Sequence, residues 1–224
     1  MAPTSSDEQP RDEAYWRQQR HEMVRAQIER RGVTNGRVLD AMRSVPRHAF
    51  LPDRLRGQAY TDQALPIGEG QTISQPYIVA CMLAALQPTG KGRALDVGSG
   101  SGYQTALLSR LYEEVIGVER VVTLAEGAAR RLEELGCANV RIVVADGTLG
   151  YEEGAPYDAI VVGAGAPEVP QPLVTQLAPG GRLVIPVGDR YLQRITTVTK
   201  GAHGATTEEG IGCVFVPLLG EHGW

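Results

Sequence analysis

The stretch Ala94–Leu108, ALDVGSGSGYQTALL, restricts the fold of this chain more than any other feature of the sequence. A short apolar run leads into a turn with glycines at positions 98, 100 and 102, and a helix-favouring segment follows. Glycine adopts positive φ angles and lets a ligand approach the backbone closely, and the first turn of a helix offers free N–H groups to an anion. The stretch therefore predicts a strand, a glycine turn and a helix that together bind a nucleotide-bearing cofactor.

Short β-type runs alternate with helix-length segments along the chain after Pro88. This alternation predicts a mostly parallel sheet covered by helices on both faces, an α/β fold of the Rossmann-like class. Two further strands joined through the glycine-rich KGAHGA are expected to run antiparallel, because a hairpin is shorter than any helical crossover. The expected strands are 93–97, 114–118, 140–145, 158–162, 182–187, 194–199 and 212–217, and the expected helices are 103–111, 121–135 and 170–177.

The part of the chain before Pro88 is predicted to be mainly helical. A charged, helix-favouring segment covers 12–31, and Thr34 is expected to cap a second helix that Pro46 ends. Short helical pieces are expected up to about Tyr60. A loop and an apolar helix over 75–86 follow.

The chain is expected to form one folded domain. We expect residues 1–20 to form a disordered or partly helical tail. Residues 21–224 are expected to form a single cofactor-binding domain, with a helical N-terminal part that extends to about residue 90.

Two positions favour S-adenosylmethionine over a dinucleotide as the cofactor. A dinucleotide fingerprint places its third glycine at position 103 for close packing of helix and strand, but that residue is Tyr103. Asp96, at the end of the first strand, would repel a pyrophosphate and attract an ammonium or a sulfonium. We therefore expect the cofactor's carboxylate on backbone N–H groups and its amine near Asp96. The cofactor-binding residues expected in this turn are Asp96, Gly98, Ser99, Gly100 and Gly102.

Two further acidic residues end the next two strands. Glu119 follows the second strand about 20 residues past the glycines, where a carboxylate accepts both ribose hydroxyls. Asp146 and Gly147 follow the third strand, where adenine is expected. Each signal alone has a plain alternative, a surface acid or a turn. Together they mark the crevice at the carboxyl ends of the strands, where open α/β sheets bind ligands.

Composition excludes several other classes. The formal net charge is −4 and no Lys/Arg cluster occurs, which argues against a nucleic-acid partner. No run of about 18 apolar residues is present to span a membrane, and the polar N-terminus lacks the apolar core of an export signal. Three distant cysteines favour a reducing compartment over a disulfide framework. We expect a cytoplasmic monomer that binds neither nucleic acid nor membrane.

Candidate catalytic bases and metal ligands are absent from the sequence pattern. Each of the four histidines reads as a surface or packing residue, and no His, Cys, Asp or Glu has metal-ligand spacing, so no metal site is predicted. Methyl transfer from a sulfonium mostly requires positioning. A carboxylate acceptor is already ionised at neutral pH, with a pKa of about 4, so it needs no base. The pattern fits a carboxylate acceptor better than an alcohol.

Nearly the whole chain, from about Met23 to Glu221, resembles the protein-L-isoaspartate (D-aspartate) O-methyltransferase family. The most specific segment is LPIGEGQTISQPYIVA, just before the cofactor region. The stretches ALDVGSGSGYQTALL, VIGVER, VVADGTLGY, APYDAIVVGAGAPEVPQPLVTQLAPGGRLVIPVG and VFVPLLGE follow in the family's order. Gly165 stands where the family usually has Ala, which we expect to loosen its loop, and the N-terminal tail is longer than in typical bacterial members.

The resemblance implies a protein-repair reaction. The enzyme would transfer a methyl group from S-adenosylmethionine to the α-carboxylate of L-isoaspartyl residues in damaged proteins, with D-aspartyl residues left open as acceptors. The ester then cyclises to a succinimide, whose hydrolysis restores some aspartyl bonds. S-adenosylhomocysteine is the other product.

The resemblance also implies the residues around the acceptor. Ser74 matches the serine that the family treats as its active-site residue, although its local sequence also fits a helix N-cap before Pro76. A capping hydroxyl still has a hydrogen to donate. Leu65, Pro66 and Ile67 are expected to form the apolar rim of the acceptor pocket, and packing in the core is the alternative for these residues. The substrate-binding residues expected are Thr72, Ile67, Ala164 and Pro167.

Three other functions remain open from the residues alone. One keeps S-adenosylmethionine but methylates a small molecule or a nucleic acid. Another is a non-catalytic adaptor that keeps the cofactor fold and recognises damaged or terminal carboxylates. The third is an NAD-linked oxidoreductase, which Tyr103 disfavours.

Overall fold

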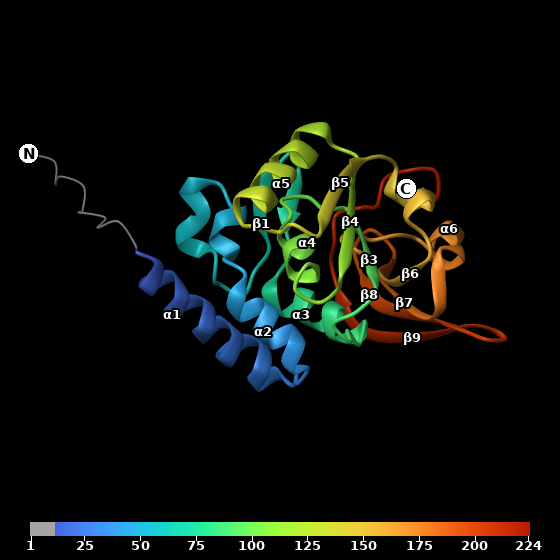
Figure 1. The fold of residues 1–224 in the computed structure, drawn as a ribbon, viewed down its shortest axis with the longest axis horizontal. Coiled ribbons are helices and arrows are strands. Elements are labelled where there is room, and N and C mark those ends of the chain that lie inside the picture. Colours follow the sequence, from blue (N-terminus) through green and yellow to red (C-terminus); the bar gives the residue numbers. More distant parts are fainter. Residues whose placement is uncertain (1–11) are drawn as a thin grey trace, which may run out of the picture.

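A seven-stranded sheet forms the centre of the computed structural model, which describes residues 12–224 (Figure 1). The strand order is β5-β4-β3-β6-β7-β8-β9. The first five are parallel, and β8 and β9 are antiparallel. This confirms the predicted fold class. The bounds are β3 Arg93–Val97, β4 Glu114–Glu119, β5 Val140–Val144, β6 Tyr157–Val162, β7 Leu177–Gly188, β8 Gln193–Gly201 and β9 Gly204–Cys213.

Successive residues of the central strands pack into different halves of the core. Ala94 and Val115 lie in the core on one face, whereas their neighbours Leu95 and Ile116 lie in the core on the other. Side chains alternate across a strand, so a run that is apolar at every position is buried on both faces. Figure 1 shows the larger helices on one face and α6 on the other. The helices are α1 Glu13–Met23, α2 Gly36–Ser44, α3 Pro76–Ala85, α4 Tyr103–Leu108, α5 Val122–Glu134 and α6 Gln171–Thr175.

The last strand differs from its expected position. The expected strand 212–217 is wrong, because β9 spans Gly204–Cys213 and the chain then leaves the sheet. Only Cys213 of β9 is buried, so no apolar alternation marks the strand in the sequence. Backbone pairing with β8 holds it. The apolar residues that follow, Val216 and Leu218, pack instead onto the second face of the sheet.

Strand β7 is longer than expected. Gly180 and Gly181, just before the expected strand 182–187, lie at an irregularity within β7, where the pairing of β6 with β7 shifts register. Gly180 has φ of +81°, and a Cβ at Gly181 would lie 2.8 Å from the carbonyl oxygen of Tyr157. Both glycines therefore fit a bulge, which the sequence could not distinguish from a turn.

The N-terminal region is helical as predicted, with a different cap. Residues Val24–Ile28 form a π-helical turn and Glu29–Arg31 a 3₁₀ turn after α1. Asn35, and not Thr34, caps α2, because its Oδ1 accepts a hydrogen bond of 3.2 Å from the N–H of Val38. The short helical pieces are confirmed as 3₁₀ turns at Arg47–Phe50 and Asp53–Gln58. Of the tail expected over 1–20, residues 1–11 lie outside the described part.

The segment expected as a loop before α3 is a β-hairpin, with β1 at Leu65–Gly68 and β2 at Gln71–Ile73. Its tip, Gly68-Glu69-Gly70, has φ of +101°, +52° and +69°. Glycine adopts such angles without strain, which explains the two glycines in this stretch. The Thr123 hydroxyl donates a hydrogen bond of 3.2 Å to the Glu69 carboxylate and ties the tip to α5.

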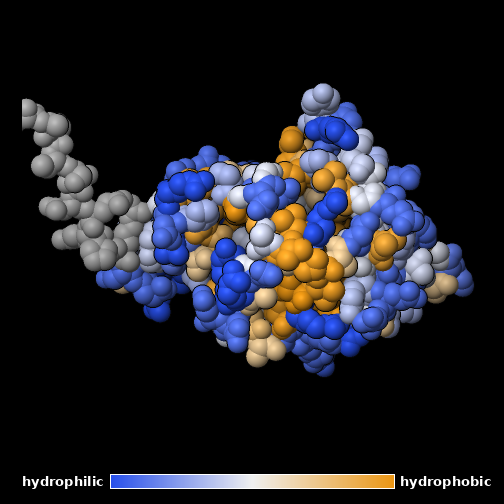
Figure 2. Space-filling model, turned by 90° about the horizontal axis from the view of Figure 1, so that it is seen from above, coloured by the Kyte–Doolittle hydropathy of each residue, from blue (hydrophilic) through white to orange (hydrophobic). Residues whose placement is uncertain are grey.

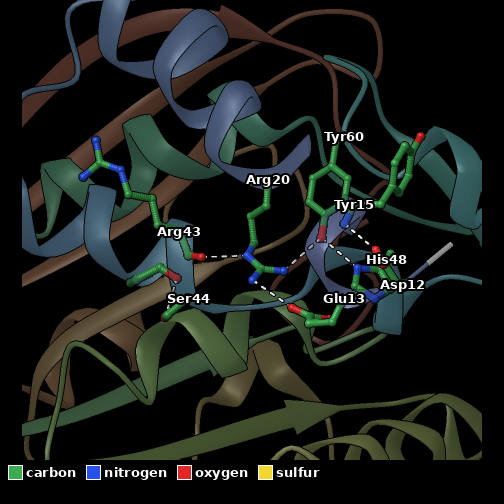
Figure 3. Close-up of polar contacts among 9 residues, drawn as sticks. Asp12, Glu13, Tyr15, Arg20, Arg43, Ser44, His48 and Tyr60 are labelled. Atoms are coloured by element: carbon green, nitrogen blue, oxygen red, sulfur yellow. Dashed lines mark hydrogen bonds and ion pairs between the residues drawn. The ribbon is translucent and has the colours of Figure 1, made fainter. Parts of the chain in front are cut away.

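A buried polar network attaches α1 to the segment that precedes the hairpin (Figure 3). Arg20 Nε donates to the carbonyl oxygen of Arg43 at 2.6 Å, and Arg20 Nη1 lies 3.4 Å from the Tyr60 hydroxyl. That hydroxyl is 2.7 Å from His48 Nδ1. The Trp16 ring stacks on His48 with centroids 4.4 Å apart. Burial lowers the pKa of His48 to about 4, so the imidazole is neutral at pH 7.

None of the helices within residues 12–224 has both the length and the apolar character needed to cross a membrane.

We predict that His48 makes stability depend on pH. Its folded pKa of about 4 lies below the ordinary 6.5, so between these values the unfolded chain binds a proton that the folded chain does not. Stability from this group is therefore lost as pH falls from about 6.5 toward 4. Because the ring is partly solvated, we expect wild type to lose about 1 kcal/mol more than His48→Asn between pH 7 and 4.5 in urea titrations.

The matched control is His203→Asn, whose imidazole is exposed in the turn between β8 and β9. It should follow wild type at every pH. A stability difference between wild type and His48→Asn that stays constant with pH would contradict the assignment.

Candidate active site

A cavity of about 220 Å³ opens at the carboxyl ends of the central strands. Strand β3 lies between β4 and β6, so the strand order reverses there, and α/β sheets bind ligands at such a point. Four strand ends, the hairpin and the C-terminal segment form its wall. The lining residues are Glu69, Gln71, Thr72, Val97, Gly98, Gly100, Val118, Glu119, Arg120, Val121, Gly147, Gly163, Ala164, Val216, Pro217, Leu218 and Leu219.

The glycine turn between β3 and α4 forms the floor. Gly98, Gly100 and Gly102 have φ of +81°, +54° and +93°, so the structure accounts for each glycine by its backbone conformation. Gly98 and Gly100 line the cavity, whereas Gly102 packs against α5, where a Cβ would lie 3.2 Å from that of Ala128. Gly147 also lines the cavity, and a Cβ there would lie 2.6 Å from Val97.

Glu119 is one of two acidic residues that line the larger cavity, and Glu69 at the hairpin tip is the other. The Glu119 side chain is 6% exposed. One carboxylate oxygen accepts a hydrogen bond of 2.9 Å from the N–H of Gly100, and the other accepts one of 2.9 Å from the N–H of Val121. An ionised carboxylate has about four acceptor positions. Two therefore remain for donors on a ligand in the cavity.

A second, smaller cavity of about 30 Å³ adjoins the first and shares with it Thr72, Gly98, Gly100 and Gly163. Ser74 and Gln104 line the smaller cavity and not the larger one. The expected helix-capping role of Ser74 is wrong, because Gln75 is the N-cap of α3 and no side chain caps it. Among residues 12–224 the Ser74 hydroxyl has no hydrogen-bond partner, so it can donate to a ligand.

Asp96 does not line either cavity. Its carboxylate is fully buried and accepts hydrogen bonds from Thr105 Oγ1 at 2.6 Å and from Gln104 Nε2 at 2.8 Å. Burial raises its pKa to about 6, although these two donors oppose the shift. The structure thus places Gln104 between Asp96 and the smaller cavity. Because no part of Asp96 is exposed, the carboxylate does not offer the direct ligand contact that the sequence analysis expected.

Asp146 also lies outside the cavity lining and instead holds the C-terminal segment. Its carboxylate accepts hydrogen bonds from the hydroxyl and N–H of Thr148 at 2.7 and 2.9 Å and from the N–H of Glu221 at 2.9 Å. Burial alone would raise the pKa of Asp146, but these hydrogen bonds outweigh it and lower the pKa.

Only some of the residues expected to contact the acceptor line the two cavities. Thr72 lines both cavities and Ala164 lines the larger one. Ser99, which was expected to bind the cofactor and not the acceptor, lines the smaller cavity. Ile67 lies outside both linings, although a Cβ at Gly100 would lie 3.3 Å from its Cδ1, and Pro167 is exposed away from them. Leu65 is buried in the core, while Pro66 is exposed.

The sequence did not identify the C-terminal wall of the cavity, Val216–Leu219. The N–H of Gly165 donates to the carbonyl of Val216 at 2.8 Å, and the N–H of Leu218 donates to the carbonyl of Gly165 at 2.7 Å. The loop at Gly165 is therefore tied on both sides and not loosened. A Cβ there would lie 3.0 Å from Gln193, which makes even alanine tight. The available signal was the apolar run VFVPLL, which is longer than a short edge strand needs.

Apolar surface surrounds the ends of these strands. Val122, the first residue of α5, and Val144, the last residue of β5, are 52% and 50% exposed, and Leu219 is 41% exposed. Figure 2 shows one face of the molecule on which hydrophobic residues gather into a patch bordered by hydrophilic ones. Within residues 12–224, no group of three or more His, Cys, Asp or Glu is placed to hold a metal ion.

The comparisons with known proteins agree on one family. The family profile described as protein-L-isoaspartate (D-aspartate) O-methyltransferase matches residues 18–223. The protein-L-isoaspartate O-methyltransferase of Syntrophus aciditrophicus is 50% identical over 93% of this chain and 97% of its own length. That of Trichlorobacter lovleyi is 53% identical over 92% and 95%.

Solved structures agree with these relatives. A Plasmodium falciparum protein-L-isoaspartate O-methyltransferase in complex with S-adenosyl-L-homocysteine has a TM-score of 0.77 and 30% identity, covering 89% of this chain and 98% of its own. A second structure with that enzyme name has a TM-score of 0.82 and 29% identity, covering 92% and 67%.

We predict that Asp146→Ala releases the C-terminal segment. The substitution removes three hydrogen bonds, so we expect a loss of about 1–2 kcal/mol in unfolding free energy. Amide exchange at Glu221 should become at least about tenfold faster. Asp189→Ala, which removes bonds to the N–H groups of Tyr191 and Leu192 in another turn, is the control. Unchanged exchange at Glu221 in Asp146→Ala would contradict the anchoring role.

Proposed function

The chain belongs to the protein-L-isoaspartate (D-aspartate) O-methyltransferase family, and we propose that it methylates the α-carboxylate of L-isoaspartyl residues in damaged proteins, using S-adenosylmethionine. The observation that carries the proposal is the family match over residues 18–223, which includes every residue around the two cavities. The methyl ester cyclises without the enzyme to a succinimide, and hydrolysis of the ring restores some aspartyl bonds.

The residues around the larger cavity fit S-adenosylmethionine. Glu119 has acceptor positions left for the two ribose hydroxyls, and Val118 and Leu219 give apolar surface for adenine. The glycine turn lets a ligand approach its backbone. S-adenosylmethionine supplies a methyl group on a sulfonium, which is a good leaving group. The fit supports one site that spans both cavities. The two cavities meet at a junction lined by the residues that they share, Thr72, Gly98, Gly100 and Gly163.

The surroundings of the junction suit an acceptor that needs no base. The residues lining the two cavities, all within 12–224, include no histidine. A carboxylate acceptor is ionised at neutral pH, so the protein has only to orient it and exclude water. We assign the orienting role to the Ser74 hydroxyl, which has no partner of its own within the described residues. Thr72 borders both cavities and would contact the acceptor at the junction.

The finer features of this activity are part of the proposal. D-aspartyl residues are a second candidate acceptor, as the family name indicates. The net charge of −4 supports an enzyme that does not bind nucleic acid. We propose that it acts as a monomer in the cytoplasm.

The test is methyl transfer from tritiated S-adenosylmethionine to a peptide that contains L-isoaspartate, beside the same peptide with normal aspartate. We expect base-labile label on the first peptide only, because a carboxyl methyl ester is hydrolysed by base. Binding of the cofactor without labelling of either peptide would instead favour a non-catalytic adaptor. Equal labelling of both peptides would overturn the isoaspartyl specificity.

We predict that Ser74→Ala lowers turnover more than cofactor affinity. One hydrogen bond to a charged acceptor is lost, so kcat with the isoaspartyl peptide should fall about tenfold to a hundredfold. The dissociation constant for S-adenosylhomocysteine, measured by calorimetry, should change less than about threefold, within the usual range for a site that keeps its other contacts. Ser44→Ala, at an exposed residue of α2 whose hydroxyl donates to the carbonyl of Ala41 at 2.8 Å, should match wild type in both measurements. Equal losses of turnover and affinity in Ser74→Ala would exclude the assigned role.

A further inference from the structure

Gln104, the second residue of α4, connects a buried charge to the smaller cavity. Its side chain lines that cavity with Ser74 and is partly exposed. Its Nε2 donates a hydrogen bond of 2.8 Å to Asp96 Oδ1. Asp96 is 0% exposed, so no ligand reaches its carboxylate without displacing Gln104 or Thr105.

The bond to Asp96 fixes which way the Gln104 amide faces. An ionised carboxylate only accepts hydrogen bonds, so it selects the NH₂ group of the amide and not the carbonyl. The amide is planar, and holding Nε2 therefore directs Oε1 away from Asp96. Within residues 12–224, Gln104 Oε1 accepts no hydrogen bond. The result is an oriented, unused acceptor on a side chain that lines the cavity.

Asp96 itself is held by a second donor. Thr105 Oγ1 donates to Asp96 Oδ2 at 2.6 Å, and Thr105 is fully buried. The two donors are adjacent residues of one helix, so the carboxylate has no freedom to turn toward the cavity. A negative charge of this kind, placed behind an amide, polarises it and makes its carbonyl oxygen a stronger acceptor.

We propose that Gln104 Oε1 binds the ammonium group at the amino-acid end of the cofactor, and that Asp96 is a positioning residue that acts through Gln104. The inference rests on the proposed function, because it takes S-adenosylmethionine as the ligand. It replaces the sequence-based expectation that the Asp96 carboxylate contacts the amine directly. Asp96 still attracts the ammonium group electrostatically, but the Gln104 amide lies between the two and its carbonyl oxygen makes the hydrogen bond.

The test compares two ligands by calorimetry, without turnover. S-adenosylhomocysteine carries the amino-acid end, and 5′-methylthioadenosine has the nucleoside and the sulfur without it. Gln104→Met keeps the length of the side chain and removes the amide. We expect it to weaken S-adenosylhomocysteine binding about tenfold to a hundredfold, the range for one hydrogen bond to a charged group. Binding of 5′-methylthioadenosine should stay within about threefold, since its contacts are unchanged.

Asp96→Asn tests the positioning role. The asparagine amide can still accept from Thr105, but it presents an NH₂ group to Gln104 and so turns the Gln104 carbonyl away from the cavity. We expect a selective loss of S-adenosylhomocysteine affinity at least as large as in Gln104→Met. The double variant should lose little more than either single one, because both changes remove the same contact.

Gln176→Met is the matched control, since Gln176 is a buried glutamine bonded to Leu149 and Tyr151 and lies outside both cavities. It should leave both affinities unchanged. Wild-type affinity for S-adenosylhomocysteine in Gln104→Met, or equal losses for both ligands, would overturn this inference alone. Failure of the wild-type chain to bind either ligand would overturn the proposed function, and the inference with it.

Discussion

The hydrogen bond from the N–H of Gly100 to the Glu119 carboxylate joins the two strand ends on which the cavity depends. It fixes the glycine turn after β3 against the end of β4, while the other oxygen of Glu119 holds the start of the next segment at Val121. The positive φ angles at the three glycines make this close approach possible. The same carboxylate thus shapes the turn and lines the cavity, so its position is set before any ligand arrives.

The part of the site that we propose for the acceptor is formed by other elements. The β1–β2 hairpin places Thr72 beside the turn, and Ser74 directly follows β2. The hairpin tip is tied to α5 through Glu69 and Thr123. No side chain caps α3, which leaves the Ser74 hydroxyl available. The absence of histidine from the residues that line the two cavities agrees with a carboxylate acceptor, because such a group arrives without a proton to remove.

Much of the fold followed from the sequence because apolar periodicity and glycine spacing record local requirements. Strand β3 was predicted to the residue, and the glycine turn was located before its geometry was known. Strand β9 was misplaced because its side chains face solvent and carry no pattern. The sequence also did not predict that Asp96 and Asp146 lie outside the cavity linings. Each depends on a hydrogen bond to a residue whose position only the folded chain defines, Gln104 for the first and Glu221 for the second.

The route of the C-terminal segment has a consequence for how the cavity forms. Val216–Leu219 leave the edge of the sheet and return to its centre, where Gly165 and Asp146 hold them. Until that return is complete the cavity lacks one wall. Docking of the segment and occupation of the cavity are therefore thermodynamically linked, and each favours the other by the same free energy. Ligand binding therefore reports whether the C-terminal segment has completed its return to the centre of the sheet.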